Sequence, residues 1–224
     1  MGLIAIGDIH GCAASLEALL EAIDPAENDH LLFIGDYIDR GPDSRGVIDQ
    51  LIALDKTHEC TFLRGNHEAL MLNYLDLGAF NLWRINGGIT TMQSYISDDG
   101  SAVEIPEEHE QFVRDTKLYY ETNDYFFVHA GLKADLTIQE NLDQFGEEVF
   151  LWERGHLEAS SFAWEKPVVC GHTPHADPVD REKLLMIDTG CVYHDQPEMG
   201  TLTAVRLPQR TYIEVAYADA PPVQ

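Results

Sequence analysis

The chain has few basic residues. Its 224 residues include 14 lysines and arginines against 39 aspartates and glutamates, which gives a formal net charge of −25. This charge opposes electrostatic binding to nucleic-acid backbones and to anionic membranes, so we expect neither as a partner. Two interpretations of the acidity remain open: a solvated acidic surface, or adaptation to a salty cytoplasm in which screening weakens the self-repulsion of the chain.

Long hydrophobic runs and paired cysteine motifs are also absent. No apolar run approaches the roughly 18 to 20 residues needed to span a bilayer, and Met1 leads into the first apolar segment without a basic leader. The cysteines show no CxxC spacing, so we expect buried reduced thiols and no disulfide framework at Cys12, Cys60, Cys170 and Cys191. These absences predict a soluble, cytoplasmic protein.

Among the features that are present, short apolar runs that end at a potential metal ligand are the most informative. We interpret each run as a buried strand. In open α/β folds, strand ends meet at the ligand-bearing edge of a sheet, so residues far apart in sequence can converge there. The runs are Leu3 to Ile6 before Gly7-Asp8-Ile9-His10, Leu31 to Ile34 before Gly35-Asp36, Thr61 to Arg64 before Gly65-Asn66-His67, Tyr125 to Val128 before His129, Val168 to Cys170 before Gly171-His172, and Leu184 to Ile187 before Asp188.

The order of the expected elements favours an α/β fold in one domain of residues 1–224. A looser stretch at about 69–121 is interpreted as a helical and loop cap inserted before the next strand. The alternating stretch Thr211 to Val215 predicts a more antiparallel second sheet, and the Pro-rich end Ala218 to Gln224 is expected to be frayed. The first third reads as a βαβαβ unit with mainly parallel pairing, with strands at 3–7, 31–35 and 60–64 and helices at about 12–23, about 44–54 and from near Asn66.

The residues at the strand ends suit metal binding. Asp8 and His10 lie two apart, so both side chains can leave on the same side and reach one ion, although a turn in which Asp8 caps the next helix is the alternative. The Gly-Asp pattern recurs at Asp36, whose carboxylate could bridge two cations. An amide oxygen and two imidazoles complete a mixed N/O donor set that suits manganese, iron or zinc better than calcium, at Asn66, His129 and His172.

A centre with two divalent ions, manganese being the first expectation, matches in-line attack of a metal-bound hydroxide on a phosphate ester. The leaving oxygen then needs a proton, which His67 is placed to give, with Asp39 holding it as imidazolium. The guanidinium groups of Arg40 and Arg154 could bind the other phosphate oxygens, although Arg154 could also be an ordinary surface residue.

These residues stand in sequence blocks with a recognisable order: Gly7-Asp8-Ile9-His10-Gly11, Gly35-Asp36-Tyr37-Ile38-Asp39-Arg40-Gly41, Gly65-Asn66-His67-Glu68 and His129-Ala130-Gly131. The blocks resemble the signature blocks of the metallo-dependent phosphoprotein phosphatases, the serine/threonine phosphatase family within the calcineurin-like phosphoesterases. They frame roughly residues 7 to 190. The flanking sequence resembles the compact bacterial and phage members of the family.

The resemblance implies a calcineurin-like metallophosphoesterase fold, in which two mixed β-sheets form a sandwich flanked by helices (α-β-β-α). It also implies roles for particular side chains. Phosphate contacts fall to Arg40, Arg154 and Asn66, and the acid pair is Asp39 and His67. One metal would be held by Asp8, His10 and Asp36, and a second by Asp36, Asn66, His129 and His172.

This sequence departs from the eukaryotic enzymes of the family. The segment Cys170-Gly171-His172-Thr173-Pro174 replaces an arginine-containing motif, and their extended C-terminal region is missing, so no regulatory subunit is implied. Asp188 is assigned a hydrogen-bonding role and not ligation. Of the remaining candidates, His175 and His194 could line the pocket, His30, His58, His109 and His156 are expected on the solvated surface, and Trp83, Tyr95 and Trp152 are expected to pack in the core, with substrate contact as the alternative.

The leading functional hypothesis is a phosphatase acting on phosphoserine and phosphothreonine in proteins or peptides, with phosphotyrosine as a further substrate class. The alternative is a symmetrical diadenosine tetraphosphate hydrolase or a broad-specificity phosphoesterase. Such hydrolases usually carry alanine at the position of Asp39, so the aspartate favours the protein phosphatase. A catalytically silent binding module is a third hypothesis, against which the complete ligand set and the Asp39 and His67 pair argue.

Overall fold

Strands and helices alternate along the N-terminal third of the protein as the sequence predicts. The structure, a computed structural model, describes residues 2–97 and 99–219. The first three strands pair in parallel, because a helix carries the chain back after each of the first two. The elements of this unit are β1 (Leu3–Ile6), α1 (Ala13–Ile23), β2 (His30–Phe33), α2 (Ser44–Asp55), β3 (Glu59–Phe62) and α3 (Asn66–Leu77).

A C-terminal hairpin completes this first sheet. β9 (Thr201–Leu207) pairs antiparallel with β1, and β10 (Thr211–Ala216) pairs antiparallel with β9, so the strand order is β10-β9-β1-β2-β3. The prediction that Thr211 to Val215 belongs to the second sheet is therefore wrong. The alternating pattern identified the strand correctly, but the choice of its neighbour depends on contacts between the two ends of the chain, such as Leu3 with Leu207.

The second sheet is mixed. Its strand order is β4-β5-β6-β8-β7, with parallel pairing in the centre and antiparallel pairing at both edges. Helices α7 (Ile138–Gln144) and α8 (Glu147–Trp152) and the turn η2 (Gly155–Glu158) lie between β5 and β6 in the chain. The strands are β4 (Tyr119–Glu121), β5 (Phe126–Val128), β6 (Val168–Cys170), β7 (Val179–Asp180) and β8 (Leu184–Met186), and the turn η3 (Cys191–Tyr193) follows β8.

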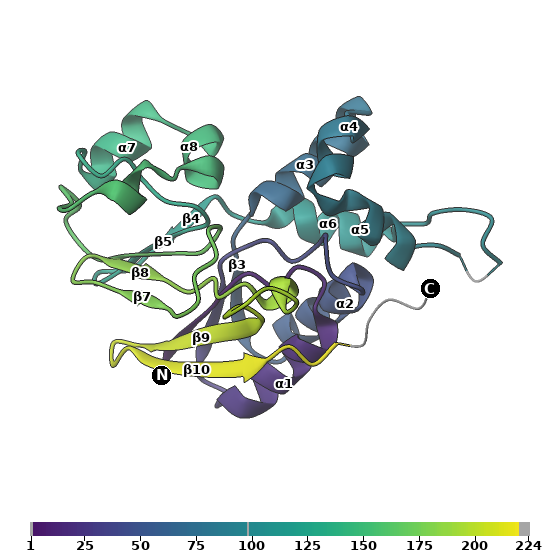
Figure 1. Ribbon diagram of the computed structural model, residues 1–224, viewed down its shortest axis with the longest axis horizontal. Helices are drawn as coiled ribbons and strands as arrows, with labels where there is room; N and C mark the ends of the chain where they lie inside the picture. Colours follow the sequence, from purple (N-terminus) through teal and green to yellow (C-terminus); the bar gives the residue numbers. More distant parts are fainter. Residues whose placement is uncertain (1, 98, 220–224) are drawn as a thin grey trace.

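The two sheets pack face to face between helices, which confirms the predicted α-β-β-α fold (Figure 1). Apolar side chains of both sheets, such as Ala5 and Leu185, fill the layer between them. α1 and α2 cover the outer face of the first sheet, where Leu16 and Leu51 pack. α7 and α8 cover the outer face of the second sheet, where Phe150 packs.

The segment predicted as a cap, at about 69–121, is mostly helical. It continues α3 and then forms α4 (Phe80–Trp83), a kinked turn η1 (Arg84–Gly88), α5 (Ile89–Ser94) and α6 (Glu107–Asp115) before β4. Gly87 has φ +110°, which breaks the helix between α4 and α5. A chain of hydrogen bonds from the Tyr95 hydroxyl through the His109 ring to Asp49 joins α5 and α6 to α2.

Residues 218 and 219 are better ordered than the sequence predicts. The carboxylate of Asp219 accepts hydrogen bonds from the backbone N–H groups of Ala14 and Ser15, and the N–H of Ala218 donates to the Ser15 hydroxyl. The expected fraying is therefore wrong for residues 218 and 219, and residues 220–224 lie outside the described part of the chain.

The sequence analysis expected reduced cysteines and no membrane-spanning segment, and the structure bears on both. All four cysteines are free thiols, and all are buried except Cys60, which is half-buried. None of the helices in residues 2–97 and 99–219 combines the length and the apolarity that a membrane crossing requires.

Candidate metal centre and active site

The ligand-bearing strand ends of both sheets meet in one place. The backbone N–H of His172, after β6, donates to Asp8 Oδ2, after β1, at 2.9 Å, which joins the ends of the two sheets. The side chains gathered here are buried: Asp8, His10, Asp36, Asn66, His67, His129, His172 and Asp188. The structure thus brings together every strand-end residue that the sequence analysis singled out.

Backbone strain is concentrated at this place. Eight residues other than glycine have positive φ in the described part of the chain, and five of them belong to the predicted site: His10, Asp36, Asp39, Arg40 and His172. A left-handed backbone costs free energy for such residues and persists only where the surroundings impose it, which is common at functional sites. The strain is independent support for a site at these loops.

Glycines before the ligands allow the loops to approach the carboxylates closely. A Cβ on Gly171 would lie 2.0 Å from Asp8 Oδ1, and one on Gly65 would lie 2.1 Å from Asp36 Oδ1. Any larger residue at either position would push a carboxylate out of place. At these two positions the chain needs glycine because the carboxylate of another strand end occupies the space of the side chain.

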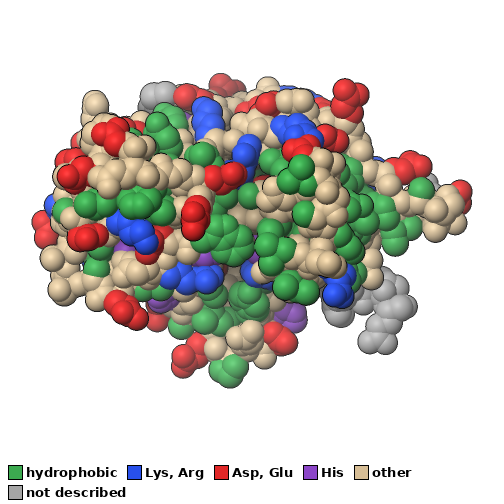
Figure 2. All heavy atoms as spheres, turned by 90° about the horizontal axis from the view of Figure 1, so that it is seen from above, with side chains coloured by type: hydrophobic (Ala, Val, Ile, Leu, Met, Phe, Trp, Pro, Cys, Tyr) green, Lys and Arg blue, Asp and Glu red, His purple; other side chains and the backbone are tan. Residues whose placement is uncertain are grey.

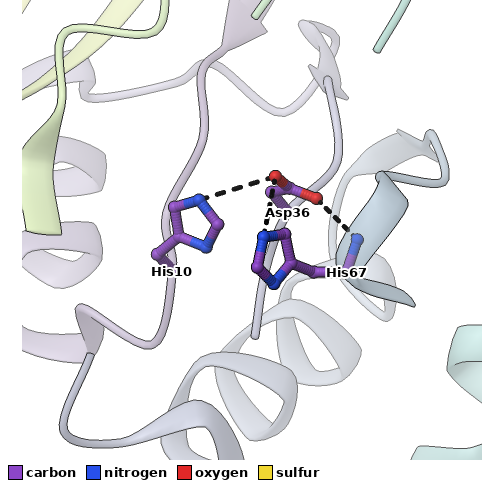
Figure 3. Close-up of side chains that lie close together, drawn as sticks. All are labelled: His10, Asp36 and His67. Carbon is purple, nitrogen blue, oxygen red and sulfur yellow. Dashed lines mark hydrogen bonds and ion pairs between the residues drawn. The ribbon is translucent and has the colours of Figure 1, made fainter. Parts of the chain in front are cut away.

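One group of donor atoms consists of His10, Asp36 and His67, whose ligand atoms lie within 4.8 Å of one another. Figure 3 shows the two imidazole rings turned toward the Asp36 carboxylate, with His10 Nε2 at 3.5 Å and His67 Nε2 at 3.9 Å from Asp36 Oδ2. The His10 ring is fixed from behind, because its Nδ1 lies 2.9 Å from the Ile38 carbonyl oxygen. This arrangement could hold a divalent cation.

A second group consists of Asp36, His129 and His172. His129 Nε2 lies 3.4 Å from Asp36 Oδ2 and 3.2 Å from His172 Nδ1. The side-chain oxygen of Asn66 lies 3.0 Å from His129 Nε2 and 2.8 Å from His172 Nδ1. Asp36 is common to both groups, as a bridging carboxylate must be.

Asp8 is placed beside these groups but is not part of either. In the described part of the chain, its Oδ1 and His172 Nε2 are buried with no hydrogen-bond partner. An orphaned buried carboxylate oxygen is costly unless a further ligand satisfies it, so Asp8 Oδ1 fits a cation that the protein alone does not supply. Asp188 accepts a hydrogen bond from the Gly190 N–H at 2.9 Å, in keeping with the hydrogen-bonding role assigned to it.

The protonation states of the candidate histidine ligands and of Asp36 suit metal ligation. Burial lowers the pKa of His10 and His129, and burial together with His129 lowers the pKa of His172 to about 2, so the imidazoles are neutral. Burial alone would raise the pKa of Asp36, but the surrounding histidines, His129 first, hold it below its usual range. Neutral imidazole and ionised carboxylate are the forms that bind metals.

Asp39 and His67 form a buried pair. Asp39 Oδ2 lies 2.6 Å from His67 Nδ1, and both side chains are fully buried. Burial alone would lower the pKa of His67, but the carboxylates of Asp36 and Asp39 raise it above its usual value. In the described residues, His67 Nε2 has no hydrogen-bond partner, so this atom is available to a substrate or to a cation.

Two residues that hold Asp39 were not predicted as part of the site. The indole N–H of Trp83 donates to both carboxylate oxygens at 2.9 Å, and the Thr91 hydroxyl donates to Asp39 Oδ1 at 2.6 Å. Trp83 is fully buried, as the core-packing interpretation expects, but its polar end serves this carboxylate. The sequence analysis gave Thr91 no role and considered Trp83 only for core packing or substrate contact.

Glu68 stands in one of the sequence blocks, but the sequence analysis gave it no role at the site. Its carboxylate is fully buried and accepts backbone N–H groups from both adjoining loops: Asp36 at 2.9 Å, Tyr37 at 2.9 Å and Gly65 at 2.8 Å. The signal that could have identified it is a glutamate three residues after the glycine that precedes a helix.

The two predicted phosphate-binding arginines lie at the same site. Arg40 Nη1 is 2.7 Å from His10 Nε2, and its guanidinium lies 5.6 Å from the centre of the Tyr193 ring. A cation bound to His10 Nε2 therefore requires Arg40 to release that atom. Arg154 is exposed, and its Nε donates to the Thr173 hydroxyl at 3.3 Å, next to His172.

The remaining aromatic and histidine candidates differ in how exposed they are. Trp152 is 38% exposed and stands edge-on to the His172 ring at 5.9 Å, so core packing is wrong for it, whereas Tyr95 is buried as expected. His175 is half-buried after the His172 loop, and His194 is exposed and stacks on Tyr217.

The expectation of solvated surface histidines is wrong for three residues. His30, His109 and His156 are buried, and His58 is half-buried. His30 Nε2 contacts the Thr61 hydroxyl at 3.0 Å and His109 contacts Tyr95 and Asp49, so polar partners from distant segments compensate for burial.

Comparisons with known proteins agree with this geometry. The calcineurin-like phosphoesterase family model matches residues 1–206. The asymmetrical bis(5'-nucleosyl)-tetraphosphatase PrpE of Anoxybacillus flavithermus is 30% identical over 94% of this chain and 92% of its own length. The serine/threonine-protein phosphatase 1 of Salmonella typhimurium is 30% identical over 85% of this chain and 87% of its own length.

Among solved structures, a candidate diadenosine tetraphosphatase superposes with a TM-score of 0.71 and 24% identity, covering 98% of this chain and 95% of that chain. This likeness confirms the fold. The family model, which spans most of the chain, implies divalent metals at the two donor groups described above. The protein therefore belongs to the calcineurin-like phosphoesterase family, within which the predicted resemblance to the metallo-dependent phosphoprotein phosphatases is confirmed.

Proposed function

We propose that this phosphoesterase hydrolyses phosphate monoesters of alcohols, with phosphoserine and phosphothreonine in proteins or peptides as the substrate class. The observation that carries the proposal is the buried Asp39 and His67 pair beside the metal-binding side chains, at 2.6 Å. An alkoxide is a poor leaving group and gains from a positioned proton donor, whereas the phosphate leaving group of a nucleotide anhydride departs without one. Phosphotyrosine, with its phenol leaving group, is a further substrate class.

The proposal assigns two divalent cations to this site. One would be held by Asp8, His10 and Asp36, and the other by Asp36 with the side chains of Asn66, His129 and His172. Manganese is proposed first because the donors mix imidazole nitrogen with carboxylate and amide oxygen, and iron or zinc fits the same set. When bound, such cations supply Lewis-acid activation of water and neutralise charge on phosphoryl oxygens.

The protein's own residues bind the phosphate and move one proton. In this proposal Arg40, Arg154 and Asn66 bind the phosphoryl oxygens that do not react. Asp39 accepts the Nδ1–H of His67 and stabilises its imidazolium form. As the bond between phosphorus and the leaving oxygen breaks, His67 Nε2 transfers its proton to that oxygen, which leaves as the alcohol.

A test of this assignment is His67→Asn, measured with manganese-loaded protein. We expect kcat/KM for a phosphothreonine peptide to fall by about 10²-fold to 10⁴-fold, and that for p-nitrophenyl phosphate, which has a good leaving group, to fall far less. Bound manganese stays unchanged. The control is His30→Asn, because His30 is a buried histidine and the first residue of β2, at the opposite end of that strand from the candidate site.

His67 also belongs to the donor group with His10 and Asp36, so metal ligation is the competing role for its Nε2. Equal losses for both substrates, together with the loss of one manganese per chain, would establish ligation and overturn the proton-donor assignment.

Hydrolysis of dinucleoside tetraphosphates is the second candidate function. It is favoured by the similarity over nearly the whole chain to the PrpE tetraphosphatase. The ratio of kcat/KM for a phosphothreonine peptide to that for diadenosine tetraphosphate separates the two. A ratio well above one supports the protein phosphatase, and a ratio well below one makes the tetraphosphatase the correct substrate assignment. The proposal includes a cytoplasmic location and no regulatory subunit.

A further inference from the structure

We infer that Trp83 and Thr91, on the segment that follows α3, are positioning residues that hold Asp39 in line with His67 for proton transfer. The inference rests on the proposed function, because it concerns the same Asp39 and His67 pair. Trp83 and Thr91 act through Asp39, and the inference gives neither of them a contact with substrate.

The Asp39 carboxylate is held from every side. His67 Nδ1 binds Oδ2, the Trp83 indole N–H is shared between both oxygens, and the Thr91 hydroxyl binds Oδ1. All four side chains are fully buried, so no water competes for these hydrogen bonds. With the Thr91 hydroxyl on Oδ1 and the Trp83 N–H between the two oxygens, the carboxylate is held in one orientation, which directs Oδ2 at His67.

Thr91 also fixes the backbone of Asp39. The N–H of Asp39 donates to the Thr91 hydroxyl at 2.9 Å and to the Ser44 hydroxyl at 3.0 Å, and these two hydroxyls lie 2.9 Å apart. Asp39 has φ +73° and Arg40 has φ +68°, a left-handed turn that is unfavourable without such support. One hydroxyl thus fixes both the backbone and the side chain of the same aspartate.

The segment that carries Trp83 and Thr91 is shaped to fit against this turn. Between them, the Gly87 carbonyl accepts the N–H of Arg40 at 3.4 Å, and a Cβ on Gly87 would lie 2.8 Å from Arg40 Cγ. A Cβ on Gly88 would lie 2.6 Å from the Trp83 ring. Although the helix is broken at Gly87, Trp83, Gly87 and Thr91 all contact the turn of Asp39 and Arg40.

The first test compares Thr91→Val with Thr91→Ser. Valine keeps the shape but removes both hydrogen bonds to Asp39, and serine keeps the hydroxyl. We expect Thr91→Val to lower kcat for a phosphothreonine peptide by about tenfold to a hundredfold with little change in KM. Thr91→Ser should keep most of the kcat of the unsubstituted protein. Loss of kcat for p-nitrophenyl phosphate should be small, because its leaving group needs no proton.

The second test is Trp83→Phe, with Trp164→Phe as the matched control. Trp164 is also fully buried, and its indole N–H donates to the Lys133 carbonyl at 3.0 Å, away from the pair. Both variants lose an indole and one buried donor, so their melting temperatures should fall alike. Only Trp83→Phe should show the loss of kcat that depends on the leaving group.

A double-mutant cycle separates positioning from general destabilisation. If Thr91 and Trp83 act through His67, adding either substitution to His67→Asn should cause almost no further loss of kcat, whereas independent effects would multiply. Multiplying effects, or a loss that is equal for both substrates, would overturn the inference.

Failure of the inference is distinguishable from failure of the proposed function. If His67→Asn shows the dependence on leaving group but Thr91→Val and Trp83→Phe do not, the proposed function stands and the inference is wrong. If His67→Asn itself lacks that dependence, the proposed proton donor is wrong and the inference is overturned with it.

Discussion

At the residue scale, Glu68 holds the two ligand loops in register. Its carboxylate joins the N–H groups of Asp36 and Tyr37 after β2 to that of Gly65 after β3. Asp36 itself has φ +52°, so its backbone needs this support to present the carboxylate to both donor groups. Metal binding should therefore depend on a residue that contacts no metal.

We predict that Glu68→Gln weakens manganese binding and lowers the free energy of unfolding by about 1–3 kcal/mol. The amide turns an –NH₂ group toward buried N–H donors that need an acceptor. Urea unfolding measures the stability, and manganese titration of the metal-free protein measures the affinity. The control is Glu140→Gln, because Glu140 accepts the N–H and hydroxyl of Thr137 at the start of α7, far along the chain from these loops. Equal manganese affinity for both variants would contradict the role given to Glu68.

The side chains that gather at the candidate site were identified from the sequence, but the residues that support them were not. Each apolar run stops at a small residue or a histidine, with a candidate ligand at the stop, which is a local pattern. The donors to Asp39 come from 44 and 52 residues away, and nothing in the sequence near Trp83 or Thr91 points to that carboxylate. Only the folded chain specifies such partners, because they depend on how α4 and α5 pack.

At the scale of elements, α1 is capped by the far end of the chain. Its own N-cap residue, Cys12, has no side-chain oxygen to accept the first N–H groups. Asp219 supplies both carboxylate oxygens instead, at 2.8 Å from Ala14 N and 3.1 Å from Ser15 N. The charge also lies at the positive end of the helix dipole, which adds to the stabilisation.

We predict that Asp219→Ala lowers the free energy of unfolding by about 1 kcal/mol and the melting temperature by roughly 2–4 °C. Differential scanning calorimetry of the two proteins measures both. The control is Asp124→Ala, which removes an exposed carboxylate that caps no helix in the described part of the chain. If both variants melt at the same temperature, the cap contributes nothing measurable.

The C-terminal hairpin of β9 and β10 shows where local sequence pattern fails to predict which strands are neighbours in a sheet. The sequence pattern predicts β1, β2, β3 and β10 but not β9, and the parallel order of β1, β2 and β3 follows from the helices between them. The hairpin of β9 and β10 has no such connection to its neighbour β1, which precedes it by nearly the whole chain. Its sheet therefore could not be predicted from local pattern.

At the scale of the whole molecule, acidic residues outnumber basic ones by 39 to 14. Figure 2 shows one face, where many acidic side chains lie toward the outline and basic and hydrophobic side chains lie nearer the middle. Most ion pairs in the described residues involve at least one exposed partner, as between Lys56 and Glu108 or Arg45 and Asp49, and such pairs contribute little to stability. The net charge of −25 is thus mainly a source of self-repulsion in the folded state.

We predict that the melting temperature of the metal-free protein rises with salt and that most of the rise is complete by about 0.15 M. Charges repel across the whole molecule at 0.01 M, where the Debye length is about 30 Å, but little beyond neighbours at 0.15 M, where it is about 8 Å. Potassium chloride and tetramethylammonium chloride should act alike, because screening depends on ionic strength alone. A rise confined to potassium chloride would show specific cation binding, and a rise that continues into molar salt would show that the acidic surface is an adaptation to a salty cytoplasm.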